Sequence, residues 1–176
     1  MGNCSIFIGC AALTMSAAAS AASLASSDGR ANLPQKLLAL HNEARAEVGA
    51  PPLVWDDSLA RSAAAYGPDL ARLGRLVHSP REMRPGQREN LAMAWTETTS
   101  AEQLVALWTD EKQMLTPGLF PAVSRSGYWK DVAHYTQMVW KGTTHVGCAV
   151  HSDQRGWSYL ICRYSPPGNV DGKPVF

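Results

Sequence analysis

Apolar residues recur every three or four positions in the first half of the chain, which is the period of an α-helix. Residues 33–48 therefore predict a first helix. A second helix is expected to begin at Asp56 or Asp57. Gly67-Pro68 should kink or end this second helix, because proline lacks the amide N–H that an interior helical residue donates.

A third helix is predicted after Ser100, which forms a capping box with Gln103. Its apolar stripe contains Leu107 and extends to Leu115, and Glu111 falls within that stripe. A carboxylate on a buried face must be paired, protonated or bound to a metal. Glu111 is therefore a candidate site residue, although an off-pattern charge more often lies at the edge of a helix and reaches solvent.

A fourth helix is expected over residues 132–140, with Asp131 as its cap and His134 in its first turn. Residues 89–95 are typical of a short strand that begins with Glu89. Helices and strands thus follow one another along one chain, as in a mixed α+β protein.

Residues 145–152 and 157–164 alternate between apolar and polar side chains and predict a β-hairpin. The register that places Cys148 opposite Cys162 also pairs apolar residues along the same face, which favours a cross-strand disulfide. This bridge would close a loop of about 15 residues and contribute on the order of 3 kcal/mol. Two buried free thiols in a cytoplasmic protein are the alternative. The residues alone thus indicate helices packed around an antiparallel sheet.

The chain has 176 residues, of which 45% are hydrophobic and 18% charged, and its formal net charge is +1. This length supports one domain with a short extension, and this apolar fraction excludes a disordered chain. A nearly neutral chain lacks the basic excess of a nucleic-acid binder, so no nucleic-acid partner is expected.

Residues 1–27 contain no charged residue and no histidine. We interpret them as a signal peptide, cleaved near residues 22–27, that leaves a domain over residues 28–176. A retained transmembrane anchor is the alternative interpretation. Cleavage would remove Cys4 and Cys10 and leave an even pair of cysteines, which is typical of an exported, disulfide-bonded domain. The expected location is therefore extracellular or periplasmic.

Two histidines and two glutamates at the ends of predicted elements are the candidate chemical residues: His78, Glu89, Glu111 and His134. Taken singly, each is more often structural than functional. Together they could bind a divalent ion such as zinc, which accepts imidazole and carboxylate ligands. They could equally form a buried hydrogen-bonded cluster without a metal.

Residues 134–148 resemble the signature of the CAP superfamily, which comprises cysteine-rich secretory proteins, venom antigen 5 and plant pathogenesis-related proteins. Further segments resemble other motifs of that family in the same order: residues 38–45, 53–56, 77–79, 89–92 and 162–169. The resemblance spans roughly residues 33–176, the whole predicted domain.

The resemblance implies an α-β-α sandwich with a central antiparallel sheet flanked by helices. It also implies a cavity lined by His78, Glu89, Glu111 and His134, in which the two histidines bind zinc or another divalent metal, and a disulfide between Cys148 and Cys162. Two positions depart from the family pattern, since Arg88 and Ala133 each replace a glycine. Both are expected to alter the loop at the cavity mouth.

The favoured functional hypothesis is a secreted, monomeric and non-enzymatic CAP (SCP-type) module that binds a sterol or fatty acid and contacts a membrane surface. Its candidate ligand-binding side chains lie in the loop 114–130: Leu119, Phe120, Tyr128 and Trp129. Exposed aromatic side chains there could contact an apolar ligand or a membrane, whereas ordinary anchoring of the loop is an equal alternative. Exposure of Phe120 and Trp129 would favour ligand contact. One alternative is a metal-dependent hydrolase or protease with Glu89 or Glu111 as general base. Another is an interaction or defence protein in which the two histidines and two glutamates are purely structural.

Overall fold

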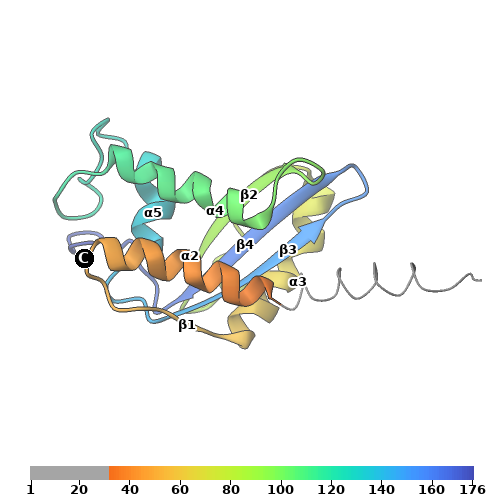
Figure 1. Cartoon of the computed structure of the whole chain (residues 1–176), viewed down its shortest axis with the longest axis horizontal. Coiled ribbons are helices and arrows are strands. Elements are labelled where there is room, and N and C mark those ends of the chain that lie inside the picture. The colour runs from red at the N-terminus through yellow and green to blue at the C-terminus, as the bar shows by residue number, and fades with distance from the viewer. Residues whose placement is uncertain (1–31) are drawn as a thin grey trace, which may run out of the picture. The chain divides into compact units, whose positions relative to one another are not determined.

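The computed structural model describes residues 32–176 (Figure 1). The predicted signal peptide, with Cys4 and Cys10, lies outside the described residues. No helix among residues 32–176 is long and apolar enough to cross a membrane.

The α-helices are α2 (Leu33–Glu47), α3 (Asp57–Leu73), α4 (Ala101–Asp110) and α5 (Ala133–Met138). The strands are β1 (Val54–Trp55), β2 (Arg88–Trp95), β3 (His145–Ser152) and β4 (Trp157–Ser165). Short 3-10 helices are η1 (Arg81–Met83), η2 (Glu111–Met114) and η3 (Trp129–Val132).

The four strands form one sheet in the order β1-β3-β4-β2. Strands β2, β4 and β3 are antiparallel, and the two-residue β1 adds a parallel pair along β3. Helix α3 covers one face of the sheet, and α2, α4 and α5 lie over the other (Figure 1). The predicted α-β-α sandwich is therefore confirmed, and the parallel pair makes the sheet mixed.

The alternation of side chains along β4 divides the core into two parts. Leu160, Cys162 and Tyr164 pack with residues of α2, α4 and α5. Tyr159 and Ile161 pack with residues of α3. The sheet is thus apolar on both faces, as its position between two helical layers requires.

The predicted hairpin register is confirmed, with Cys148 opposite Cys162 and Val146 opposite Tyr164. The two cysteines form a disulfide, and their Cα atoms lie 4.1 Å apart. The covalent bond therefore joins strands that already pair in the register set by their apolar faces.

Helix α3 continues through Gly67-Pro68, so the expectation that it ends there is wrong. Pro68 and Ala64 are both exposed, which leaves the carbonyl that proline cannot engage open to water. Gly67 faces the sheet, and a Cβ at this position would overlap the side chain of His151. Close packing on the sheet therefore explains the glycine.

Helix α4 is shorter than the predicted third helix and continues as the 3-10 helix η2. The capping box of Ser100 and Gln103 is confirmed. Leu107, assigned to the apolar stripe, is 55% exposed. The change of helical pitch at Asp110 alters which side chains face the core beyond it, so Glu111 does not continue the buried face of an α-helix.

Gly147→Ala should destabilise the fold, because a Cβ at Gly147 would collide with the backbone nitrogen of Ala60 in α3. Overpacking of this kind costs about 1–3 kcal/mol or more. The melting temperature should fall by about 4–10 °C. Gly142→Ala is the matched control, because the nearest neighbour of its Cβ would lie 3.5 Å away. Equal melting temperatures for the two variants would contradict this packing argument.

The buried His41 makes the stability sensitive to acid. Its Nδ1 donates to the carbonyl of Leu37 at 2.7 Å, so Nε2 accepts the hydroxyl of Tyr164 at 2.8 Å. Burial is the largest influence on this imidazole and lowers its pKa from 6.5 to about 4. His41 is therefore neutral in the folded protein at neutral pH.

The free energy of unfolding should fall as the pH drops from 6.5 to about 4, because His41 then binds a proton in the unfolded chain and not in the folded one. The expected loss is about 3 kcal/mol by pH 4, measured by urea unfolding across this range. In His41→Gln, the free energy of unfolding should fall by about 3 kcal/mol less over the same pH range. An identical pH dependence of the two proteins would rule out His41 as the cause.

Candidate functional site

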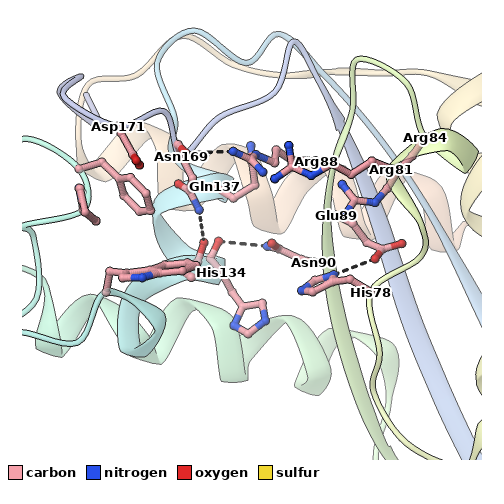
Figure 2. Close-up of a pocket in the computed structure, with 14 residues that line it drawn as sticks. His78, Arg81, Arg84, Arg88, Glu89, Asn90, His134, Gln137, Asn169 and Asp171 are labelled. Atoms are coloured by element: carbon pink, nitrogen blue, oxygen red, sulfur yellow. Dashed lines mark hydrogen bonds and ion pairs between the residues drawn. The ribbon is translucent and has the colours of Figure 1, made fainter.

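A cavity of about 480 Å³ opens beside the start of β2, the helix α5 and the loop between η2 and η3 (Figure 2). Its lining comes from residues 78–90, 120–137 and 169–171. This volume is in the range of sites that bind small molecules. His78, Glu89 and His134 line the cavity, and Glu111 lies behind His134. The four residues singled out in the sequence thus belong to one region.

His78 and Glu89 form a hydrogen-bonded pair on the cavity wall. Nδ1 of His78 lies 2.7 Å from Oε1 of Glu89, and the imidazole is half exposed while the carboxylate is buried. Arg163 lies 3.0 Å from the other oxygen, and Ser79 donates to both oxygens. Burial raises the pKa of the Glu89 carboxyl, but the His78 hydrogen bond and the Arg163 charge outweigh burial and lower it. Glu89 is therefore ionised at neutral pH.

Glu111 follows the last residue of α4, and its carboxylate binds the start of α5. Oε2 accepts the backbone N–H groups of His134 and Tyr135 at 2.9 and 3.0 Å, and Oε1 lies 2.5 Å from Nδ1 of His134. These amides have no partner within α5, so Glu111 acts as the cap of that helix. The prediction that Asp131 caps it is wrong, because Asp131 instead accepts a hydrogen bond from Ser126.

Asn90 connects the strand of Glu89 to the helix of His134. Its Nδ2 donates to the carbonyl of His134 at 3.0 Å and to the hydroxyl of Tyr164 at 3.1 Å. Successive side chains of a strand point to opposite faces, so Asn90 reaches α5 while Glu89 reaches Arg163. The sequence marked this segment as a motif but gave no sign of these contacts.

The two histidines have the same hydrogen-bonding arrangement. Each Nδ1 is held by a carboxylate, and neither Nε2 has a hydrogen-bond partner among residues 32–176. An imidazole that binds a metal through one nitrogen commonly donates its other N–H to a carboxylate. Both rings line the cavity, and their hydrogen bonds to carboxylates are of the kind that metal-binding imidazoles make.

The two glutamates are placed to orient the histidines. Every carboxylate oxygen of Glu89 and Glu111 already accepts a hydrogen bond from the protein. The geometry therefore assigns these carboxylates to the support of the imidazoles through Nδ1, and it leaves Nε2 of each ring without a hydrogen-bond partner among residues 32–176.

A second group of metal-ligating atoms lies in the core and was not singled out in the sequence. A nitrogen of His41 and the sulfurs of Cys148 and Cys162 lie within 4.8 Å of one another. The two sulfurs are joined as a disulfide, and both nitrogens of His41 are hydrogen-bonded. In this arrangement the three side chains stabilise the core.

The candidate ligand-binding loop presents a divided set of side chains. Leu119, Tyr128 and Trp129 are exposed, whereas Phe120 is only 4% exposed, so Phe120 anchors the loop and Trp129 remains accessible. The Phe120 ring packs edge-on against Trp129 and Trp140. Phe120 and Trp129 line the cavity, so their edges add an apolar portion to its wall.

Arg88, which departs from the family glycine, lines the cavity together with Arg81 and Arg84 (Figure 2). Burial lowers the pKa of Arg88, and repulsion by the other two guanidinium groups lowers it further. The three residues lie in a 3-10 helix, a loop and a strand, so no single period in the sequence indicates that they converge.

The model of the CAP family, described as the cysteine-rich secretory protein family, matches residues 38–164. Pathogenesis-related protein 1C of Nicotiana tabacum is 38% identical over 145 residues, which cover 82% of this chain and of that protein. Pathogenesis-related leaf protein 6 of Solanum lycopersicum is 37% identical over 142 residues, which cover 81% of this chain and 82% of that protein.

Solved structures agree with this assignment. The crystal structure of NaASP2 with Zn²⁺ matches with a TM-score of 0.67 and 25% identity, covering 81% of this chain and 84% of that chain. The crystal structure of Na-ASP-1 matches with a TM-score of 0.70 and 25% identity, covering 82% of this chain and 41% of that chain. Together with the family match and the shared fold, these similarities show that the chain belongs to the cysteine-rich secretory protein family.

Proposed function

We propose that this chain is an exported, non-enzymatic binding module whose cavity takes an apolar small molecule of the lipid class, a sterol or a fatty acid. The observation that carries the proposal is the mixed wall of the cavity, which combines Phe120, Pro121 and Trp129 with polar side chains. Binding sites for small molecules combine such an apolar wall with a few placed polar groups. Exposed Leu119 and Tyr128 extend this apolar surface on the same loop, where it can contact a membrane.

The proposal includes a divalent metal ion, such as zinc, held by Nε2 of His78 and of His134. The carboxylates on both Nδ1 atoms support it, because they orient each ring and raise its basicity. NaASP2, whose fold is similar, was crystallised with Zn²⁺, which supports the choice of zinc. A bound ion would add a Lewis-acidic centre that accepts an oxygen atom of a ligand.

Binding is favoured over hydrolysis by the hydrogen bonds of the glutamates. Catalytic zinc commonly has three protein ligands, and here two imidazoles are available. A glutamate acting as third ligand or general base would have to release donors it now holds, including the buried Arg163 at Glu89 and the α5 amides at Glu111. Loss of these partners would leave buried polar groups unsatisfied.

Export is supported by the disulfide between Cys148 and Cys162, since such bonds persist mainly in oxidising compartments. The proposed location is therefore extracellular or periplasmic, after removal of the signal peptide. The protein would act as a monomer.

Zinc titration by calorimetry at about pH 7 should show one saturable site that both His78→Ala and His134→Ala abolish, because a single imidazole holds zinc weakly. His145→Ala is the control, since this histidine does not line the cavity. If zinc still binds to both cavity variants, or if His145→Ala loses the site as well, the metal lies elsewhere.

Radiolabelled cholesterol and oleate test the lipid site. At least one should bind saturably, and Trp129→Ala should weaken that binding about tenfold by removing apolar contact area. Trp95→Ala is a matched control, because Trp95 is 43% exposed against 37% for Trp129 but lies outside the cavity. The proposal fails if neither lipid binds, or if both variants weaken binding equally.

A further inference from the structure

We propose that Arg81, Arg84 and Arg88 form an oxyanion subsite at the edge of the cavity. The inference rests on the lipid-binding function proposed above and makes its ligand more specific. The ligand class that fits is a single-chain amphiphile with a phosphate monoester head group.

Two of these guanidinium groups are held in place by uncharged partners. Arg88 donates to the carbonyls of Gly168 and Asn169 at 3.0 and 3.2 Å. Arg84 donates to Ser79 and to the carbonyl of Gln87. Carbonyl oxygens fix the position of an arginine but do not neutralise its charge.

N–H groups of all three arginines remain for a ligand. Within residues 32–176, Nη1 of Arg88 and Nη2 of Arg84 donate to no protein atom, and Arg81 makes no side-chain hydrogen bond. None of the three forms an ion pair with a described residue. A guanidinium presents its donors in a planar fork that matches the oxygens of phosphate or carboxylate.

The charge of the cavity lining favours an anion with more than one negative charge. The lining contains three arginines and two carboxylates, Glu89 and Asp171. Glu89 is already paired with the buried Arg163, which is not part of the lining. Asp171 therefore opposes the three arginines alone, and two positive charges remain. A phosphate monoester carries about −1.5 to −2 at pH 7 and matches this excess better than a carboxylate does.

The subsite also lies next to apolar surface. The same three arginines line an adjacent hollow of about 280 Å³ that includes Pro85 and Val170. They therefore stand between this hollow and the cavity that Phe120 and Trp129 line. A head group bound there leaves its acyl chain next to apolar side chains.

Calorimetry with three probes tests the proposal. 1-Oleoyl-glycerol 3-phosphate carries both an oleoyl chain and a phosphate group, 1-monooleoylglycerol carries only the oleoyl chain, and inorganic phosphate is the head group alone. The titrations are made on the folded protein with a chelator present, so that no metal binds the phosphate. The phosphate amphiphile should bind about tenfold more tightly than the neutral one. Arg81→Gln combined with Arg88→Gln should remove this preference, because the variant weakens binding of the phosphate amphiphile more than binding of monooleoylglycerol.

Arg61→Gln is the control for the single variant Arg81→Gln, because it too removes one positive charge, from an exposed position of α3 outside both hollows. Arg81→Gln alone is a variant that should fold normally, since the Arg81 side chain makes no hydrogen bond within residues 32–176. It should weaken binding of the phosphate amphiphile about threefold or more. Equal affinity for the two amphiphiles overturns the subsite but leaves the lipid function standing. A preference that survives in the arginine variants, or that Arg61→Gln also removes, overturns the subsite as well. Binding of inorganic phosphate without either amphiphile overturns the amphiphile as the ligand of the subsite, while the lipid function is decided separately by the cholesterol and oleate titrations.

Discussion

The register of β4 between β2 and β3 determines where both cavity histidines lie. Tyr164 shares the face of the disulfide and is linked through one β2 side chain to the carbonyl of His134. Arg163 points to the opposite face and meets Glu89, which in turn holds His78. A shift of β4 by one residue would exchange these faces, and it would separate Glu89 from Arg163 and Asn90 from Tyr164. The disulfide and the apolar pairs around it therefore fix the geometry of the cavity as well as the sheet.

Glu89 and Glu111 already make interactions on which the stability of the fold depends, and these interactions limit any part that the two carboxylates could take in a reaction. Glu89 neutralises a buried arginine, and Glu111 satisfies two amides at the start of α5. Breaking a buried ion pair costs about 3–5 kcal/mol. A buried amide that loses its hydrogen-bond partner also lowers the stability of the fold. A reaction that required either carboxylate to move would therefore work against the stability of the domain. The engagement of both carboxylates is thus the physical basis on which the proposed binding function is preferred to hydrolysis.

Much of the fold could be predicted because its signals are local. The hairpin followed from a period of two together with one cysteine pair, and the register was correct. The cap of α5 could not be found in this way, since the nearby Asp131 is the residue that local rules select, whereas Glu111 reaches the helix from a different element. The burial of Phe120 likewise depends on ring contacts with Trp129 of the same loop and with Trp140, which follows α5. Tertiary contacts of this type leave no periodic trace in the sequence, and the grouping of the four candidate site residues came from family resemblance.

The arginines of this domain show how local surroundings separate a structural charge from one available to a ligand. Arg45 is fully buried, and its donors reach four backbone carbonyls, so no N–H group is directed to solvent. Arg163 is equally buried and is neutralised by Glu89. Arg88 is anchored by carbonyls in the same way as Arg45, but it stands at a cavity, and its Nη1 donates to no atom of residues 32–176. The same kind of anchoring therefore encloses one guanidinium in the core and leaves the other with a donor at the cavity, and the difference is whether further carbonyls lie within reach of the remaining N–H groups.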